Sequence, residues 1–229
     1  MPKILCLETA TVNCSVALFD GENLIAVAES NDGSFSHSEK LHVYIKDVLD
    51  RAGISPSGLD CVAVSRGPGS YTGLRIGVSA AKGLAYALDV PVVAVDTLGI
   101  MARVAADSCN SDIYVPMIDA RRMEVYTAAY SAGMEMINRT AAVIVDGDSF
   151  SYLPQDRTVC FCGDGVEKCR TFIDIPKAVF MPDVYPSARA MGGVAFRRYE
   201  AKHFEDTAYF EPYYLKDFVS TSQINKKTK

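Results

Sequence analysis

A glycine-rich stretch is the part of the sequence whose residue types and spacing best suit binding chemistry. It covers residues 65–77 and reads SRGPGSYTGLRIG, between an apolar run and a helical pattern. Free backbone N–H groups and the helix dipole favour an anion at a helix start. The stretch has neither the Lys-Ser/Thr of a P-loop nor the setting of a Rossmann turn. A tight turn with a helix cap therefore explains it equally well. The candidate anion-binding residues are Gly67, Gly69, Ser70, Thr72 and Gly73.

Other candidate catalytic groups are few. Glu8 follows the first apolar run and could act as a catalytic or Mg²⁺-binding carboxylate, or simply cap the next turn. Residues 119–122, DARR, could hold an anion, but a charged hairpin turn is the favoured interpretation. His37 and His42 are five residues apart, on different helix faces, and His203 is isolated. The sequence therefore lacks the i, i+4 histidine pair of a helical metal site and predicts no metal.

The seven cysteines predict reduced thiols rather than disulfides or a metal cluster. Their number is odd, and Cys6, Cys14 and Cys61 lie in apolar runs, where a free thiol behaves as a small hydrophobic group. Cys160-Phe161-Cys162 places two thiols on one strand face, and Cys169 does not complete a tetrahedral set with a second cluster. We therefore expect an intracellular, cytoplasmic protein.

Charge and hydropathy exclude two classes of protein. The 229 residues carry a formal net charge of −5, with a sequence pI near 5.2, so a basic surface that grips RNA unaided is not expected. No apolar stretch approaches the roughly 20 residues of a membrane span. The first residues read MPKILCLE, a strand pattern rather than a secretory leader.

Two α/β units follow from the order of the predicted elements. The first half reads as three strands (3–8, 12–19 and 24–29), then helices and strands in alternation to about residue 106. Ser36 and Glu39 fit a capping box at the first helix, and Gly53 ends it. The second half reads as strands at 113–118, 124–131, 135–145, 159–162 and 178–180, then a helix at 186–203, which suggests a related α/β lobe. We place the boundary between residues 108 and 109, giving domains 1–108 and 109–229, with residues 212–215 free to return to the first domain.

The helix at residues 72–88 carries small residues at a spacing of four. Gly73, Gly77 and Ala81 recur on one face, with Gly83 and Ala87 nearby. Glycine inside a helix costs about 1 kcal/mol relative to alanine, so a close approach of another backbone should offset the cost. From the residues alone, packing on the chain's own sheet is favoured over packing on a helix of another chain.

Five segments resemble the bacterial TsaB family, also called YeaZ. The opening ILCLETA resembles the family's I-L-x-I-D-T-S, and residues 35–41, FSHSEKL, resemble x-x-H-S-E-x-L. Residues 66–77 resemble R-G-P-G-S-[FY]-T-G-L-R-I-G, the most specific match. Residues 119–126 resemble D-A-R-R-x-E-V-Y, and residues 212–216 resemble P-x-Y-L-R. Residues 145–191 match only weakly.

The resemblance implies a fold and a role. The fold is α/β, with two ribonuclease-H-like lobes of the actin, Hsp70 and sugar-kinase superfamily. The role is that of a noncatalytic subunit in the synthesis of N6-threonylcarbamoyladenosine at position 37 of tRNA. In this family the paralogue TsaD carries a His-x-x-x-His metal site and transfers the group, and TsaE is the ATPase partner. The resemblance implies that TsaB binds TsaD as a scaffold, forms a homodimer without it, and meets tRNA only through the complex.

The resemblance also implies that the first two helices form the TsaD interface. We expect seven of their residues in that interface: Leu41, Tyr44, Ile45, Val48, Leu74, Val78 and Ala81. No cofactor is expected for the chain alone. Binding of ATP or ADP is expected only within the complex.

Two departures from the superfamily pattern and two alternative enzyme classes bear on this interpretation. Glu8 stands where superfamily kinases have Asp, and Ala10 replaces the usual Ser, which argues against Mg²⁺-dependent phosphate chemistry. The alternative remains a nucleotide-binding phosphotransferase that uses Glu8 and the loop 67–73. A metalloprotease is disfavoured because the histidine pair is missing.

Overall fold

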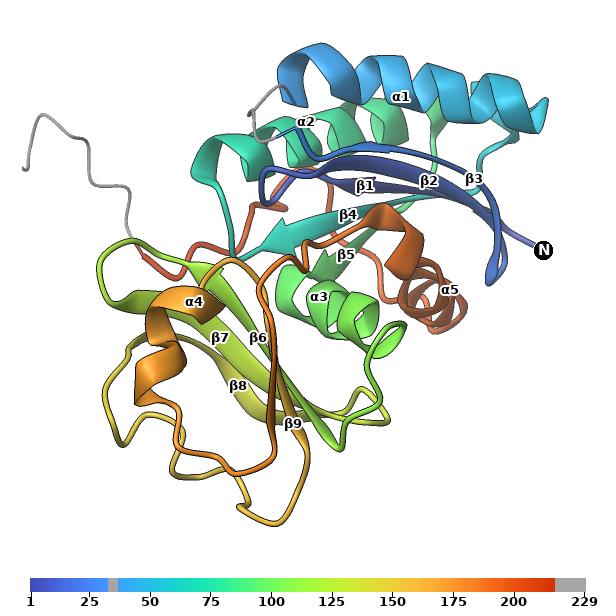
Figure 1. Cartoon of the computed structure of the whole chain (residues 1–229). Helices are drawn as coiled ribbons and strands as arrows, with labels where there is room; N and C mark the ends of the chain where they lie inside the picture. The colour runs from blue at the N-terminus through green and yellow to red at the C-terminus, as the bar shows by residue number, and fades with distance from the viewer. Residues whose placement is uncertain (33–36, 217–229) are drawn as a thin grey trace, which may run out of the picture.

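The computed structural model describes residues 1–32 and 37–216. Two mixed five-stranded sheets form its framework (Figure 1). The order of strands is β3-β2-β1-β4-β5 in the first sheet and β10-β9-β6-β7-β8 in the second. Counting strands from the start of each half, both orders are 3-2-1-4-5. The two predicted α/β units of ribonuclease-H-like type are therefore confirmed by a duplicated topology.

The first sheet consists of β1 (Lys3–Glu8), β2 (Cys14–Asp20), β3 (Asn23–Ser30), β4 (Cys61–Gly67) and β5 (Val92–Asp96). The first three strands are antiparallel neighbours, whereas β1, β4 and β5 run parallel. The turn between β2 and β3 contains Gly21 at φ +62°, a left-handed conformation that glycine adopts without strain. This is the turn that Asp20-Gly21 predicts.

Helices cover both faces of the first sheet. Along β1, Leu5 and Leu7 face α1 (His37–Ala52) and α2 (Tyr71–Leu88), because side chains alternate between faces along a strand. Ile4 and Cys6 point to the opposite face, against α3 (Thr97–Ala106) and α5 (Gly192–Glu200). A short helix, η1 (Pro56–Gly58), precedes β4. Gly53 ends α1 at φ +65°, as the sequence predicts, whereas Ser36 of the predicted capping box lies outside the described residues.

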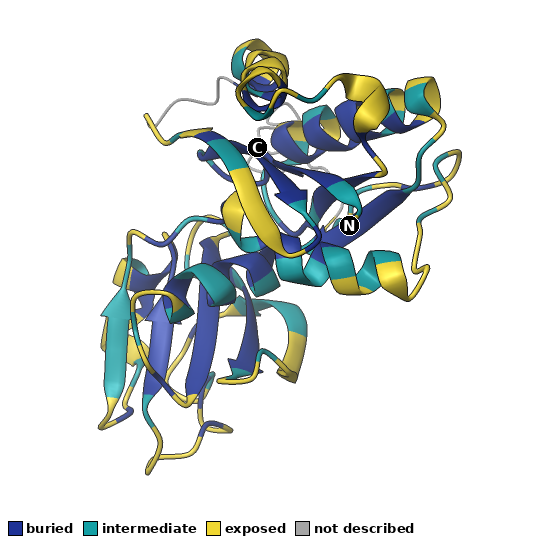
Figure 2. Ribbon diagram, turned by 90° about the vertical axis from the view of Figure 1, so that its right-hand side faces the viewer, coloured by how far each residue is buried: buried dark blue, intermediate teal, exposed yellow. Residues whose placement is uncertain are grey.

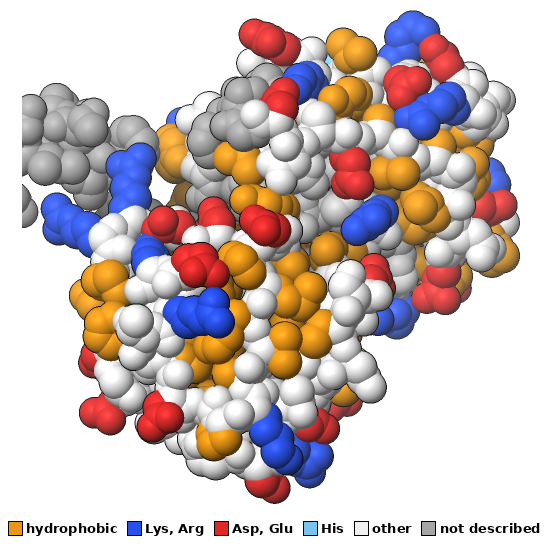
Figure 3. Space-filling model, in the orientation of Figure 1, with side chains coloured by type: hydrophobic (Ala, Val, Ile, Leu, Met, Phe, Trp, Pro, Cys, Tyr) orange, Lys and Arg blue, Asp and Glu red, His pale blue; other side chains and the backbone are white. Residues whose placement is uncertain are grey.

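The second sheet is covered more lightly. It consists of β6 (Ile113–Asp119), β7 (Glu124–Ser131), β8 (Met136–Ile144), β9 (Val159–Cys162) and β10 (Ala178–Met181). One face packs on α3, and the other on α4 (Val166–Cys169) and the buried Phe150 and Leu153. The short helices η2 (Arg170–Phe172) and η3 (Ala188–Ala190) complete the elements. Figure 3 shows hydrophobic side chains at the surface of this lobe among charged ones.

Helix α3 lies between the two sheets (Figure 1). Its Ile100 packs with Val93 and Val95 of the first sheet, while Leu98 and Met101 belong to a cluster on the second. All three α3 side chains are at most 1% exposed. This single helix therefore supplies part of the core of each lobe.

The chain returns to the first sheet after β10. The predicted helix at 186–203 is divided into η3 and α5, and both pack against the first sheet. Residues 205–216 then form an extended strap: Glu205 N–H donates to Val92 O at 2.9 Å, and Phe210 enters the core beside α2. The proposed boundary at 108/109 stays a prediction. In the described structure, segments well beyond that boundary pack on the first sheet.

The position of α3 leads to a test of stability. We expect Leu98→Ala to lower the free energy of unfolding by about 2–5 kcal/mol, since the side chain is fully buried between the sheets. Urea denaturation monitored by circular dichroism measures this change. The matched control is Leu24→Ala, on a β3 side chain that is 46% exposed, where the change should stay below about 1 kcal/mol. Equal losses in the two variants would contradict the assignment of the core.

Candidate functional site

The glycine-rich stretch connects the end of β4 to the first turn of α2. Ser70 is the N-cap, and its Oγ accepts a hydrogen bond from Gly73 N–H at 3.3 Å. Its own backbone N–H donates to Ala10 O at 2.7 Å. Gly67 has φ +116°, and a Cβ there would lie 2.7 Å from Tyr213 O in the strap. The predicted turn and cap are therefore present.

The glycines of this stretch are required by the chain's own β1–β2 turn. A Cβ on Gly69 would lie 2.3 Å from Ala10 O, one on Gly73 2.1 Å from Thr9 O, and one on Gly77 2.3 Å from Thr9 Oγ1. These separations are far below contact distance, so any other residue would displace the backbone of the turn at Gly69 and Gly73, or the Thr9 side chain at Gly77. Thr9 Oγ1 also donates to Gly73 O at 2.7 Å. Internal packing, the interpretation favoured from the residues alone, accounts for Gly73 and Gly77.

Glu8 is buried beneath this turn rather than presented in a cleft. It is 0% exposed, and its Oε1 accepts a hydrogen bond from Ala10 N–H at 2.6 Å. Desolvation by burial raises the pKa of its carboxyl from 4.5 to about 7, although the bond from Ala10 and the Ser65 hydroxyl act in the opposite direction. The carboxyl thus caps the turn, which the sequence left as one of two interpretations.

His37 has a structural partner. Its ring is 1% exposed, and Nε2 lies 2.8 Å from Thr11 O of the β1–β2 turn. Desolvation lowers the pKa of the imidazole, so the neutral ring is favoured. Four residues later stands Leu41, whose side chain is fully buried in the core. Among the described residues, no group of three or more His, Cys, Asp or Glu side chains is placed to hold a metal ion.

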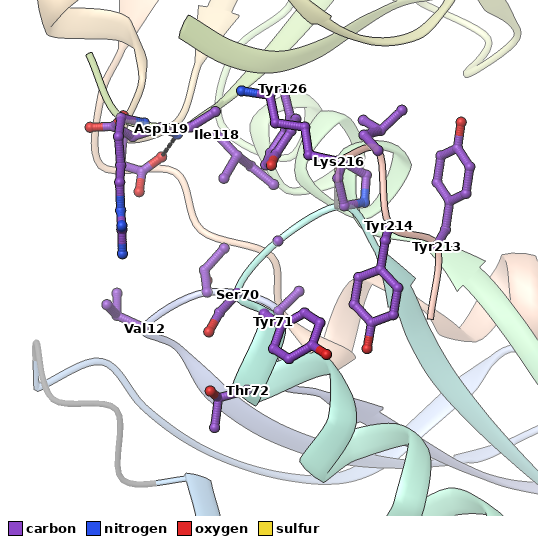
Figure 4. Close-up of a pocket in the computed structure, with 18 residues that line it drawn as sticks. Val12, Ser70, Tyr71, Thr72, Ile118, Asp119, Tyr126, Tyr213, Tyr214 and Lys216 are labelled. Atoms are coloured by element: carbon purple, nitrogen blue, oxygen red, sulfur yellow. Dashed lines mark hydrogen bonds between the residues drawn. The ribbon is translucent and has the colours of Figure 1, made fainter. Parts of the chain in front are cut away.

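A cleft of about 520 Å³ lies between the two lobes (Figure 4). Ser70, Tyr71 and Thr72 at the start of α2 form one wall, together with residues 10–12. The β6–β7 turn, residues 118–121, forms the opposite wall. Thr11 lines this cleft and is only 6% exposed, and its hydroxyl makes no hydrogen bond to the described part of the chain. Of the candidate anion loop, Gly69, Ser70 and Thr72 line the cleft, whereas Gly67 and Gly73 do not.

The β6–β7 turn is held by its own lobe. Arg121 N–H donates to Asp119 Oδ1 at 2.6 Å, and Asp119 N–H donates to Asp164 Oδ1 at 2.9 Å. Lys168 forms an ion pair with Asp119 and donates to the carbonyls of Arg122 and Glu124 at 2.9 and 2.7 Å. The charged hairpin turn favoured from the sequence is therefore present, and whether its arginines also bind an anion stays a prediction.

The strap closes one side of the cleft, a role that sequence reasoning missed. Tyr214 packs against Tyr71 with ring centroids 4.9 Å apart and ring planes tilted by 36°, and its hydroxyl accepts a hydrogen bond from Arg75 Nε at 3.2 Å. Lys216 then forms an ion pair with Glu124 of the second lobe. The strap thus contacts α2 and then the second sheet (Figure 4). The motif PYYLK was visible in the sequence, but it does not reveal which distant residues it meets.

The residues predicted for a partner interface point inward. Six of them are buried against the chain's own sheet, with exposed fractions between 0 and 6%, and Tyr44 is half-buried. The six are Leu41, Ile45, Val48, Leu74, Val78 and Ala81. Their selection as contact residues is corrected, because an apolar stripe on a helix first covers its own sheet. A charge at Val48 would disrupt the core rather than test an interface.

The outward faces of α1 and α2 carry other residues. On α1, Lys46 pairs with Asp50 and Asp47 with Arg51, and Val43 is 62% exposed. On α2, the exposed positions include Arg75, Ser79, Gly83 and Tyr86, the last 89% exposed. Figure 2 shows this division, with the helices dark blue toward the sheet and yellow away from it.

Comparisons with known proteins identify the family. A family model described as TsaD, tRNA N6-adenosine threonylcarbamoyltransferase, matches residues 31–219. The tRNA threonylcarbamoyladenosine biosynthesis protein TsaB of Escherichia coli K12 is 38% identical over 128 residues, which is 56% of this chain and 54% of that protein. The solved structure of YeaZ from Pseudomonas aeruginosa superposes with a TM-score of 0.83 at 29% identity, covering 94% of this chain and 100% of that chain. The chain belongs to the TsaB (YeaZ) family.

Other relatives extend the picture of this TsaB-family chain. TsaB of Bacillus subtilis strain 168 is 36% identical over 128 residues, 56% of this chain and 54% of that protein. In sequence, the chain spans about half the length of these curated relatives. EutJ of Carboxydothermus hydrogenoformans shares the fold at 13% identity, with a TM-score of 0.50 over 86% of this chain and 90% of that chain. This likeness shows a shared fold alone.

Two glycines of α2 give a matched test of the close approach to Thr9. We expect Gly73→Ala to lower the free energy of unfolding by about 1–3 kcal/mol, because the new Cβ overlaps Thr9 O. Gly83→Ala should raise it by about 0.5–1 kcal/mol, since nothing lies within 4 Å of that Cβ and alanine favours the helix. Chemical denaturation of both variants checks the difference. Equal effects of the two changes would refute the packing argument.

Burial of Glu8 predicts a pH effect with a defined sign. The folded-state pKa of about 7 exceeds the unfolded value near 4.5, so the folded chain holds the proton more tightly. Stability due to this group is therefore full below about pH 4.5 and declines as pH rises toward about 7. We expect Glu8→Gln to remove that decline and to raise stability at pH 8 by about 1–3 kcal/mol.

Urea titrations of the native and Glu8→Gln chains at several pH values measure this effect. The depressed pKa of His37 acts in the opposite direction, because its stabilisation is lost as pH falls below about 6.5. Both chains contain His37, so the difference between their curves isolates Glu8. Parallel curves from pH 5 to pH 8 would show that the carboxyl is not held protonated.

Proposed function

We propose that this TsaB-family chain is a noncatalytic scaffold subunit that binds and stabilises a TsaD transferase during synthesis of N6-threonylcarbamoyladenosine at position 37 of tRNA. The names of its relatives support the pathway. The observation that favours a scaffold lies on the outward face of α2. One glycine there is not required by any close contact within the chain.

Gly83 is that glycine. Gly73 and Gly77 are explained by Thr9, but a Cβ on Gly83 would meet nothing within 4 Å, and the residue is exposed. Glycine at this interior helix position costs about 1 kcal/mol relative to alanine. Ser79, four residues earlier, is also small and exposed, and Tyr86 stands beside them almost fully exposed. A small surface flanked by an aromatic side chain suits the close approach of a partner helix.

Two further features support a subunit without chemistry of its own. The ring of His37 is committed to Thr11 O, and Leu41 takes the position where a second metal-binding histidine would stand. Glu8, at the end of β1, is buried, and desolvation raises the pKa of its carboxyl to about 7. Catalysis would then belong to TsaD.

The proposal extends to the remaining partners. With a net charge of −5, this chain is suited to meeting tRNA through the complex rather than alone. TsaE is the proposed ATPase partner, and a homodimer through the outward face of α2 is the proposed state when TsaD is absent. The proposed scaffold function would take place in the cytoplasm. Within the described residues, no helix is long and apolar enough to cross a membrane.

A nucleotide-binding phosphotransferase is the alternative, and the cleft between the lobes favours it. Thr11 lines that cleft beside the start of α2, and its buried hydroxyl has no hydrogen-bond partner among the described residues. A helix start of this kind suits a phosphate group. Against it stands Glu8, which does not line the cleft.

The partner proposal is tested at Gly83. We expect Gly83→Arg to remain folded, because the side chain enters open space, and to weaken binding to TsaD by at least about 10-fold, since it places a long charged group in a close contact. Size-exclusion chromatography with light scattering, followed by titration calorimetry, measures the complex. Gly83→Ala is the matched comparison and should weaken binding less than Gly83→Arg does, because its added side chain is a single methyl group.

Two outcomes separate the proposals. Full-strength binding by a folded Gly83→Arg chain would exclude the outward face of α2 as the interface. Calorimetric binding of ATP·Mg²⁺ to the isolated chain, with loss of ATP turnover in Glu8→Gln, would instead support the phosphotransferase. The scaffold proposal requires that Glu8→Gln leave the TsaD complex and its tRNA modification intact.

A further inference from the structure

Three cysteine thiols gather beneath the end of α3. Cys160 and Cys162 lie on the same face of β9 and belong to the buried cluster that packs on α3. Cys109, in the connection between α3 and β6, packs against the same cluster. Cys160 and Cys162 are fully buried, whereas Cys109 is half-buried and so within reach of small solutes. All three are free thiols.

Tyr114 fixes Cys109 above this face. Tyr114 is the register partner of Cys160 on the neighbouring strand, so the two side chains stand side by side on one face of the sheet. The Tyr114 hydroxyl donates to Cys109 O at 2.6 Å and accepts from Ser111 N–H at 3.1 Å. Tyr114 thus holds the Cys109 backbone over the cluster that contains Cys160, while the Cys109 Sγ lies 3.3 Å from Ser111 Oγ.

The thiols are close enough to interact. Hydrogen bonds from the thiols of Cys162 and Cys109 lower the pKa of Cys160 against the effect of burial. The pKa of Cys162 is raised, by its hydrogen bond to Cys160 and by burial. Cys160 therefore has the greater thiolate character, and thiolates are the nucleophiles of thiol oxidation.

Geometry favours Cys109 over Cys162 as the partner of Cys160. Cysteines two apart on a regular strand have Cα atoms about 6.7 Å apart, at the upper limit for a disulfide, so bridging them would distort β9. Cys109 approaches from a connecting segment outside the sheet, where small backbone movements disturb no strand pairing. It is also the thiol that a dissolved oxidant reaches first.

We propose that Cys109 and Cys160 form a disulfide when the chain meets a peroxide. Hydrogen peroxide oxidises the Cys109 thiol to a sulfenic acid and leaves as one water. Cys160 sulfur then attacks the sulfenic sulfur, the S–O bond breaks, and the departing hydroxide takes the Cys160 proton as a second water. Two thiols lose two electrons in total, and one peroxide is reduced to two waters.

The bond would join the α3–β6 connection to the middle of the second sheet. Because α3 also packs on the first sheet, this bridge would restrain the contact between the lobes. The inference is independent of any partner or of the proposed tRNA function.

The test is peroxide titration of the purified full chain, followed by alkylation and mass spectrometry without reductant. We expect the number of reactive thiols in the denatured protein to fall from seven to five, the mass to fall by two hydrogens, and a Cys109–Cys160 peptide to appear. The midpoint of thermal unfolding should rise and return to its starting value with dithiothreitol.

Two variants sharpen the result. Cys109→Ser should retain all six remaining thiols under the same treatment. Cys169→Ser, which removes a buried thiol of the other sheet face, should still lose two. Accumulation of Cys109 sulfinic acid without a cross-link would overturn the proposal, as would a Cys160–Cys162 bridge or a native chain that keeps seven thiols. The peptide map of the native chain decides the matter even if a variant fails to fold.

Discussion

The close approach of the β1–β2 turn to the start of α2 is the constraint on which the rest of the structure depends. Thr9 and Ala10 lie against the helix at Gly69, Gly73 and Gly77, with Thr9 Oγ1 donating to Gly73 O. Any side chain larger than hydrogen at these three positions would collide with backbone or with the Thr9 side chain. The contact fixes α2 on the sheet and thereby decides which face of the helix remains available to a partner.

The same turn also collects the polar groups that could have carried chemistry. Glu8 accepts from Ala10 N–H, and His37 meets Thr11 O, so both side chains satisfy backbone groups of one tight turn. Buried polar groups cost free energy unless they are hydrogen-bonded, which gives these residues a structural role. In this TsaB-family chain, the β1–β2 turn therefore engages both Glu8 and His37 through its backbone.

The two lobes are held by contacts from distant parts of the sequence. Helix α3 contributes to the cores on both sheets, and the strap from residue 205 to 216 passes from β5 along α2 to Glu124. The exposed ion pair at its end contributes little by itself, because solvent screens it. The buried Phe210 and the packing of Tyr214 against Tyr71 are the stronger attachments.

The sequence by itself determined the repeated order of elements, because strand and helix periodicities, the turn at Gly21 and the helix end at Gly53 are local properties of the chain. It also indicated the family and a helix cap at Ser70 or Thr72, which the structure places at Ser70. Tertiary structure decided the rest. An apolar stripe such as Leu41 to Val48 has the same sequence pattern whether the helix packs on its own sheet or on another protein. Only the packing showed that it faces inward. Likewise, the sequence alone does not distinguish the surroundings of Gly73 from those of Gly83, because both are glycines within one helical pattern. Their difference, one against Thr9 and one in open space, depends on a turn more than sixty residues away along the chain.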